Sequence, residues 1–551
     1  MTKNLHLARA ALSAALALAA CGSPTPSATS AGPDDAGPPD FGPAPNTMSV
    51  TLPSCAPNTD TVPARVLPTE PPSVSALRVD GRRIVNASGD DVALRGTNFG
   101  AWLQAETWLS ATGRAPAGVE CATAHATCYH DLLMSDAEAE AARLGLADAF
   151  SRARSRTAID WLAETAPRWP MIQRWRAAMW AQPGTQRQQT IELWQFIDAL
   201  PWIFEEESLW AYLQTRFGAA GAERLRRTHQ DHWITELDVE RLAALGLNTI
   251  RVPIWYAQLE QETDTGVSYR IDGWQRLDDI ARWARLHGVY LILDLHGAPG
   301  GQSHYDHQGL RNGGSLWTRP ECVSRTASLW NAIATHFRGD PHVAMYDLLN
   351  EPKSPNATAY ADIHTALYRA IRTADPEHMI AIEEGYAGVD RVRSPSELGF
   401  SQTVFELHDY PSWTTADELG SDMERSVDRW LEAGTRFDTP ILVGEFNAEA
   451  SGPDGSPAGM PLRIAAMDAV MARLNARGVH WTTWTWKTGG RADSVWGLYH
   501  PADARWIDVS TADLDTVDAA FRATNSATWT PIPAYEAVFR ARAADPVTLL
   551  R

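Results

Sequence analysis

The stretch "VAMYDLLNEPKSPN", residues 343–356, begins as an apolar run and reaches Asn350, Glu351 and Pro352. A short apolar run of this kind, bounded by turn residues, is typical of a strand buried in a parallel sheet. A carboxylate therefore stands where burial is expected to stop. We interpret residues 343–350 as a buried strand with a functional carboxylate just past its end.

The same pattern recurs along the chain from about residue 76. Amphipathic helical patterns separate the apolar runs, and a hairpin around Asp80 and Gly81 precedes the first run. The eight strand candidates are residues 92–98, 247–252, 289–296, 343–350, 378–383, 402–408, 440–445 and 479–486. Eight strands that alternate with helices predict an α/β fold, a (β/α)8 TIM barrel with an N-terminal hairpin, rather than an open sheet.

One long segment, about residues 108–230, interrupts this alternation. Its Ala, Arg, Glu and Trp residues recur at helical spacing, which predicts a large helical insertion after the first strand. At that point it would lie over the C-terminal face of the barrel and shape access to it. A purely stabilising cap is the alternative. Residues 76–551 are thus expected to form one barrel domain that carries this insertion.

The N-terminal region predicts export. Lys3 and Arg9 precede a short apolar run that ends at Cys21, and the run resembles a lipoprotein signal peptide, residues 1–21, with lipidation at Cys21. Cleavage as an ordinary signal peptide is the alternative. Residues 22–75 are rich in Pro, Ser and Gly and predict a disordered tether. We expect an exported protein, lipid-anchored to the cell envelope (outer membrane or cell surface) or extracellular, that meets the membrane only through its anchor.

The net charge bears on the class of partner, and the cysteines bear on the expected disulfides. The 551 residues carry a formal net charge of −19, which opposes nucleic-acid binding and favours a neutral partner. With Cys21 assigned to the lipid, four cysteines remain in an oxidising compartment and allow three pairings. Cys121 and Cys128 are the expected disulfide, because a short segment that can bend joins them.

Polar residues gather where the predicted strands end, which is where TIM barrels carry out chemistry. These residues are Arg251, His296, Asn350, Glu351, His408, Tyr410 and Glu445. Glu351 and Glu445 follow the fourth and seventh strands, on opposite sides of the barrel mouth, so they can converge on a small molecule. A carboxyl pair with one protonated and one ionised member predicts cleavage of a glycosidic bond.

Six motifs carry a family resemblance: "LRGTNFGAWL", "DLHGAPGGQ", "LLNEP", "FELHDY", "ILVGEF" and "TWTWK". Together they resemble glycoside hydrolase family 5, the cellulase family, and in particular its exo-β-1,3-glucanase-like branch, over roughly residues 76–545 apart from the insertion. The resemblance implies a retaining O-glycosyl hydrolase that acts on β-glucan without a cofactor. It implies Glu351 as acid/base and Glu445 as nucleophile, with the carboxyl groups about 5 to 5.5 Å apart.

The resemblance also implies roles around this pair. Arg251 would keep Glu445 ionised, and Tyr410 would donate a hydrogen bond to Glu445. Asn350 would bind the sugar 2-hydroxyl, a contact that strengthens in the transition state. Two histidines would line the same subsite, His296 and His408.

Further positions are implied to contact sugar. Trp484 would be the sugar platform, with Trp486 as the alternative if the register differs. The other positions carried over from the family are Glu106, Asp306, Tyr305 and Trp413. His296, His304 and His307 could suggest a metal site, but their loop matches the family's sugar-binding loop, so no metal is expected.

The chain departs from the family pattern at two points that bear on specificity. The family has "EPW" where this chain has Glu106, Thr107 and Trp108, and the loop 305–309 differs in its small polar residues. Exo-β-1,3-glucanase action is therefore the first hypothesis, and an endo-acting β-1,4- or β-1,6-glucanase is the alternative. A non-catalytic surface carbohydrate-binding protein is the alternative from another class.

Overall fold

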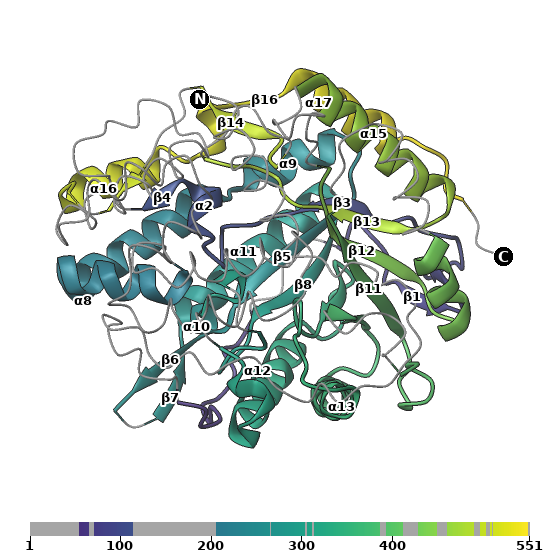
Figure 1. The fold of residues 1–551 in the computed structure, drawn as a ribbon, viewed down its shortest axis with the longest axis horizontal. Helices are drawn as coiled ribbons and strands as arrows, with labels where there is room; N and C mark the ends of the chain where they lie inside the picture. The colour runs from purple at the N-terminus through teal and green to yellow at the C-terminus, as the bar shows by residue number, and fades with distance from the viewer. Residues whose placement is uncertain are drawn as a thin grey trace, which may run out of the picture.

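The computed structural model describes residues 54–65, 71–113, 205–264, 266–303, 306–310, 313–385, 393–410, 428–448, 460–489, 496–502, 507–509 and 511–548. Within them, eight parallel strands close into a barrel at the centre of the molecule (Figure 1). In order around the ring they are β3 (Arg95–Asn98), β5 (Thr249–Trp255), β8 (Tyr290–Gly297), β9 (Val343–Asp347), β10 (Met379–Glu383), β11 (Thr403–Asp409), β12 (Ile441–Phe446) and β13 (His480–Thr483). All eight overlap the predicted strands, so the (β/α)8 prediction is confirmed.

Helices surround the barrel (Figure 1). They are α8 (Glu206–Trp233), α9 (Glu236–Ala244), α11 (Ile271–His287), α12 (Pro320–Phe337), α13 (Ala357–Ala374), α15 (Met460–Ala476), α16 (Leu514–Arg522) and α17 (Pro533–Ala543). Shorter helical segments are α2 (Thr107–Ser110), α10 (Tyr256–Leu259), η1 (Asp306–Gln308), η2 (Ser315–Trp317) and η5 (Ser526–Thr528). None of the helices that the structure describes has the length and apolarity needed to cross a membrane.

Local sequence signals set the helix ends. The side chain of Asn356 accepts a hydrogen bond from the Ala359 amide and caps α13. Pro320 occupies the first turn of α12, where its missing amide proton costs no hydrogen bond. Gly288 ends α11 with a φ of 71°, a left-handed conformation that glycine adopts without steric penalty.

Short two-stranded sheets lie outside the closed barrel. The predicted hairpin is present as β1 (Arg78–Asp80) and β2 (Arg83–Val85), which pair antiparallel. Leu77, just before this hairpin, and Ile84 of β2 belong to one buried cluster with Ile292 and Met345, so the hairpin covers apolar side chains inside the barrel. The other pairs are β4 (Thr112–Gly113) with β15 (Ile507–Asp508), β6 (Glu260–Thr263) with β7 (Gly266–Tyr269), and β14 (Tyr499–Pro501) with β16 (Trp529–Pro531).

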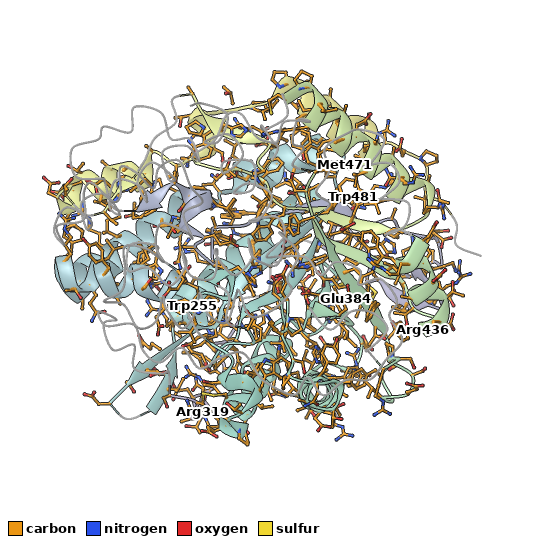
Figure 2. All side chains as sticks on the ribbon, viewed as in Figure 1. Trp255, Arg319, Glu384, Arg436, Met471 and Trp481 are labelled. Atoms are coloured by element: carbon orange, nitrogen blue, oxygen red, sulfur yellow. A yellow bond between two sulfur atoms is a disulfide. The ribbon has the colours of Figure 1, made fainter. Side chains whose placement is uncertain are left out.

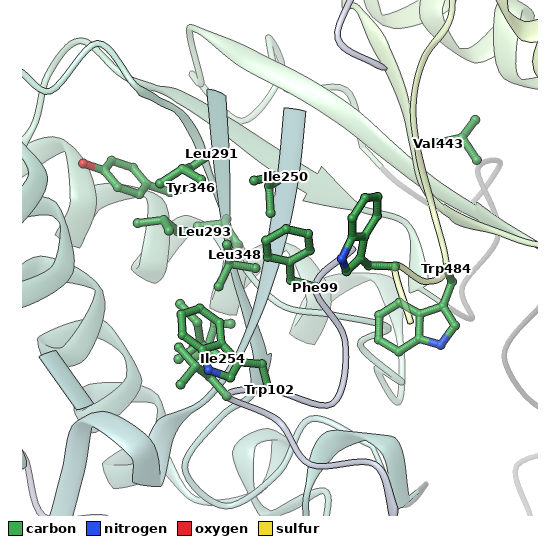
Figure 3. Packing of buried hydrophobic residues seen from close by; sticks show 14 of the residues in the cluster. Phe99, Trp102, Ile250, Ile254, Leu291, Leu293, Tyr346, Leu348, Val443 and Trp484 are labelled. Carbon is green, nitrogen blue, oxygen red and sulfur yellow. The ribbon is translucent and has the colours of Figure 1, made fainter. Parts of the chain in front are cut away.

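The main core lies between the barrel and its helices. Leu291 and Leu293 of β8 face this layer, whereas Ile292 between them belongs to the interior cluster, as the alternation of side chains along a strand requires. Figure 3 shows part of the layer around Leu291 and Leu293. Trp481 of β13 and Met471 of α15, labelled in Figure 2, belong to the same layer on the other side of the barrel.

The predicted insertion, about residues 108–230, is described only at its two ends. Residues 114–204 lie outside the described residues, and the segment that follows is helical, as predicted, in α8. This helix packs along α16 at one edge of the molecule (Figure 1), where Leu213 and Leu225 meet Phe521.

The predicted disordered tether, residues 22–75, is wrong at its C-terminal end. Cys55 forms a disulfide with Cys322 of α12, and the Arg65 guanidinium lies 2.5 Å from the Asp340 carboxylate. These contacts hold residues 54–65 against the barrel despite their polar composition, because a covalent bond and buried ion pairs replace apolar burial. Cys121 and Cys128 lie outside the described residues, so their pairing stays a prediction.

Candidate active site

The polar residues named from the strand ends meet at the carboxyl ends of the barrel strands. Glu445 lies near the end of β12, and Glu351 follows β9 by a few residues. One carboxylate oxygen of each lies within 4.8 Å of the other. His408 at the end of β11 stands between them, its Nδ1 2.9 Å from Glu351 Oε1 and 3.5 Å from Glu445 Oε2. All three side chains are nearly inaccessible to water.

Glu445 receives two strong donors. Arg251 Nη1 donates to Glu445 Oε1 at 2.8 Å, and the Tyr410 hydroxyl donates to Oε2 at 2.6 Å. A guanidinium and a hydroxyl that both donate to a carboxylate stabilise its charged form. The structure therefore brings together the three residues that the sequence analysis grouped here.

Asn350 is fixed by the same guanidinium. Its side-chain oxygen accepts from Arg251 Nη2 at 2.9 Å, so its amide NH2 group turns away from Arg251. The backbone oxygen of Asn350 accepts from Gln302 Nε2 at 2.9 Å. The orientation of Asn350 is thus set from two sides before any ligand arrives.

The backbone at Glu351 is unusual. Its φ of 42° lies in the left-handed region, which residues with a Cβ seldom adopt. The Glu351 amide donates to Glu383 Oε2 at 2.5 Å, and Gly385 lets the chain pass so close to Pro352 that a Cβ would lie 2.2 Å from the Pro352 oxygen. Glu383 and Gly385 therefore hold the strained conformation that presents the Glu351 side chain.

Below the pair lies a buried group of four acids, which we call the acidic layer: Asp294, Asp347, Glu383 and Glu406. Burial opposes the charge of Arg251, but the surrounding carboxylates outweigh it and raise its pKa well above the usual value. Arg251 lies 3.1 Å from Asp294, 2.8 Å from Asp347 and 3.1 Å from Glu406.

The surroundings shift the pKa values of the acidic layer in different directions. Burial, reinforced by neighbouring carboxylates, raises the pKa of Asp294, Asp347 and Glu383 well above the usual range. Burial acts the same way on Glu406, but Arg251 and His408 outweigh it and lower its pKa. Glu406 is therefore the member of the layer whose charged form its neighbours stabilise.

His408 is expected to be cationic. Burial lowers its pKa, but Glu383 and Glu445, with hydrogen bonds to Glu351 and Glu406, raise it well above the usual value. An imidazolium donates from both ring nitrogens. Its Nδ1–H therefore points at Glu351, while Nε2 lies 3.4 Å from Glu406 Oε1.

Trp484 lies against His296, one of the residues expected to line the sugar site. Its ring stacks on His296 with centroids 5.4 Å apart and an angle of 10° between the planes. The alternative, Trp486, lies elsewhere, because its indole nitrogen donates to Asp238 and its ring packs on Phe99. The role of Trp484 as the sugar platform stays a prediction.

His296 links this platform to Glu106. Its Nδ1 lies 2.7 Å from Asp294 Oδ2, and its Nε2 lies 3.8 Å from Glu106 Oε1. Burial, helped by the positive charge of Arg251, lowers the pKa of His296 well below its usual value, so the ring is neutral. Tyr305, Trp413 and the side chain of Asp306 lie outside the described residues, and their roles stay predictions.

Comparison with known proteins identifies the family. The sequence matches the model described as "Cellulase (glycosyl hydrolase family 5)" over residues 185–490, which is more than half of the chain. The protein belongs to glycosyl hydrolase family 5, a family of O-glycosyl hydrolases.

The matches between this family 5 protein and its curated relatives span only part of each chain. The β-xylosidase of Phanerodontia chrysosporium is 31% identical over 182 residues, which are 33% of this chain and 38% of that protein. The probable glucan 1,3-beta-glucosidase A of Emericella nidulans is 28% identical over 346 residues, 53% of this chain and 82% of that protein. Endoglucanase C of Acetivibrio thermocellus is 26% identical over 185 residues, 33% of this chain and 52% of that protein.

Solved structures with a similar chain trace include the following two. An endogalactoceramidase superposes with a TM-score of 0.46 at 14% identity, covering 82% of this chain and 85% of that one. Endoglucanase Cel5A of Thermotoga maritima gives a TM-score of 0.40 at 18% identity, covering 52% of this chain and 90% of that one.

Several site residues of this family 5 protein were missed by the sequence analysis. Alternation along a strand could have pointed to two of them, because Asp294 and Glu406 stand two residues before His296 and His408 and so face the same way. His307 was considered only as a metal ligand, yet its Nε2 lies 3.3 Å from Glu351 Oε2.

The C-terminal end of the insertion, at the start of α8, also contacts the site. Glu206, the first residue of α8, is buried and accepts hydrogen bonds from the Ala105 amide and the Trp210 indole. The Glu207 amide donates to the Gly309 oxygen at 3.0 Å. The start of α8 thus contacts both the loop that carries Glu106 and the loop that carries His307.

Proposed function

We propose that this protein is a retaining exo-β-1,3-glucanase, which releases glucose from the ends of β-1,3-glucan by double displacement. The observation that carries the proposal is the approach of Glu351 and Glu445 to within 4.8 Å between carboxylate oxygens. Retaining enzymes hold the two carboxyl groups about 5 to 5.5 Å apart, whereas inverting enzymes need about 6.5 to 9.5 Å to admit a water.

In this proposal Glu445 is the nucleophile. Its carboxylate attacks the anomeric carbon, and the hydrogen bonds from Arg251 and Tyr410 hold it in place until the bond forms. Asn350 is oriented to donate to the sugar 2-hydroxyl, and Trp484 forms the floor beneath the sugar ring.

Glu351 is proposed as the acid/base. It gives a proton to the glycosidic oxygen in the first step, and in the second it removes a proton from the water that attacks the glycosyl-enzyme. The nearby negative charge of Glu445 favours the protonated form of Glu351 at rest, and that charge is gone once the glycosyl-enzyme has formed.

The substrate class is supported by the relatives. The probable glucan 1,3-beta-glucosidases A of Emericella nidulans and Aspergillus niger are 28% and 27% identical, and the matches cover 82% and 72% of their lengths. Six motifs of this chain resemble the same branch.

Early products distinguish exo from endo action. We expect laminarin to yield glucose alone as the first product, formed as the β-anomer, and pustulan and carboxymethylcellulose to be poor substrates. Chromatography of the first per cent of reaction, with proton NMR of the anomeric signal, measures both. Mixed oligosaccharides would replace the exo proposal by an endo one, and an initial α-anomer would refute retention. Sugar binding without cleavage of any of the three would leave only the carbohydrate-binding alternative.

We also propose that the protein is exported and lipid-anchored through Cys21. The disulfide between Cys55 and Cys322 supports export, because disulfides persist in oxidising compartments. We expect wild-type protein in the membrane fraction and Cys21→Ser in the soluble fraction of the same cells. Equal membrane retention of the two forms would contradict the anchor.

A further inference from the structure

Glu206, the first residue of α8, is a fully buried acid whose two oxygens face three nitrogen donors. Its Oε1 accepts from the Trp210 indole, one turn further along α8, and from Gln258 Nε2 on α10 at 2.7 Å. Its Oε2 accepts from the Ala105 amide. One oxygen is therefore held from the helix and from the barrel side, and the other binds a single backbone N–H group.

The donors around Glu206 match a carboxylate rather than an amide or an apolar side chain. Burial opposes the charge and raises the pKa of Glu206 to about 7, although the three hydrogen bonds and the charge of Arg226 act in the opposite direction. An apolar residue in its place would leave the Ala105 amide and the Trp210 indole without this acceptor. The hydrogen bond to Ala105 joins α8 to a loop 101 residues earlier in the chain.

Ala105 lies in the short loop that places Glu106. The loop is attached to β5 at Leu103, whose carbonyl oxygen accepts from the Trp255 amide at 2.9 Å. It ends at Glu106, which is the N-cap residue of α2. Ala105 stands between these two attachments, so its hydrogen bond to Glu206 helps to fix the direction in which the chain arrives at Glu106.

The Glu106 side chain lies beside the residues expected to line the sugar site. Its Oε1 is 3.8 Å from His296 Nε2, and the His296 ring stacks on Trp484. The Glu106 carboxylate does not cap α2, although Glu106 occupies the N-cap position. The position of this carboxylate therefore depends on the loop that carries it.

We propose that Glu206 is a positioning residue for substrate binding, which holds the Glu106 carboxylate in the sugar site by binding the Ala105 amide. The inference rests on the proposed function and gives Glu106 the sugar contact that the family resemblance implies for it. Glu206 itself touches no sugar and acts through Glu106. The C-terminal end of the insertion thus contributes to recognition of the terminal glucose.

The test is a double-mutant cycle between Glu206 and Glu106, with kcat/KM as the readout. Glu206→Gln keeps the shape of the side chain, and its amide oxygen can still accept from Trp210 and Gln258. The NH2 group then faces the Ala105 amide, and that hydrogen bond is lost. We expect Glu206→Gln alone to lose about 10-fold in kcat/KM, mainly through a raised KM. In the Glu106→Ala background the same substitution should cost less than about 2-fold, because the contact that it positions is already gone.

Two substrates give a second readout. Laminaritriose and 2,4-dinitrophenyl β-glucoside carry the same terminal glucose, but the departing sugar of laminaritriose needs a proton and the dinitrophenolate does not. We expect equal losses on the two substrates, because Glu106 is proposed to contact the glucose and not the leaving group. A loss confined to laminaritriose would place the effect of Glu206 in proton transfer and overturn the inference.

The cycle can fail in three further ways, each of which overturns the inference and leaves the proposed function standing. The same loss in both backgrounds would show that Glu206 acts independently of Glu106. No loss in Glu206→Gln would show that its hydrogen bond to Ala105 does not affect binding, and wild-type kcat/KM in Glu106→Ala would remove Glu106 from the sugar site. Failure of the wild type to cleave either substrate would instead refute the proposed function.

Glu236→Gln is the matched control. Glu236 is also the first residue of its helix, α9, but its side chain is half-exposed, and the variant should keep full activity in both backgrounds. The thermal midpoint of each variant reports folding. If Glu206→Gln does not fold, Glu206→Asp takes its place in the same cycle, because the side chain is one methylene too short to reach all three donors.

Discussion

Glu445→Gln is expected to lose at least about 10⁴-fold in kcat/KM with both laminaritriose and a dinitrophenyl glucoside. An amide cannot supply the electron pair that bonds to the anomeric carbon, and a good leaving group does not replace a missing nucleophile. The substitution also removes the negative charge that Arg251 Nη1 contacts at 2.8 Å. Initial rates on the two substrates measure the loss.

Binding should survive this change, because Glu445→Gln keeps the shape of the side chain and Trp484 and Asn350 remain. Calorimetric titration with laminaritriose is expected to give a Kd within about 10-fold of wild type. Glu432→Gln, an exposed acid on the outside of the barrel, is the matched control and should retain full activity. More than one per cent of wild-type activity in Glu445→Gln, measured with protein free of wild-type enzyme, would remove Glu445 from the nucleophile's role.

Glu351→Gln is expected to affect the two substrates unequally. With laminaritriose, kcat/KM should fall about 10² to 10⁴-fold, because the departing sugar then leaves without a proton. With the dinitrophenyl glucoside it should fall far less, since that leaving group needs no acid. Because Glu351 is also the base that activates water, the second step should become slow and limit turnover. Both kcat and KM for the dinitrophenyl glucoside should then fall.

The losses on the two substrates distinguish the roles of Glu351 and Glu445. A loss in Glu351→Gln that is equal for both substrates would place Glu351 in binding rather than in proton transfer. Glu397→Gln, an exposed glutamate whose carboxylate caps the Ser394 amide, is the matched control.

The sequence analysis was accurate where the signal is local. Apolar runs with strand length located all eight barrel strands, and the position of Glu351 after one run and of Glu445 at the end of another placed both at the barrel mouth. The choice of Trp484 over Trp486 came from the family motif, because residues two apart on a strand face the same way and alternation cannot distinguish them.

Other features depended on contacts between distant residues. The sequence analysis assigned residues 54–65 to the flexible tether because their polar composition can bury little apolar surface. The disulfide from Cys55 to Cys322, which joins positions 267 residues apart, holds them in place instead. Similarly, the sequence alone shows Glu383 only as a polar residue at the end of a strand, β10. Its contact with the Glu351 amide exists only because the barrel sets β9 beside β10.

The amino-acid sequence by itself determined the alternation of strands and helices, the two acids at strand ends and the family to which the protein belongs, because hydrophobic periodicity and motifs are properties of neighbouring residues. Only the tertiary structure decided which charges share one buried space. Closing the barrel gathers the acidic layer around Arg251 and brings His307 to Glu351. In that dry interior each carboxylate's proton depends on its nearest cation, a relation that no spacing along the chain records.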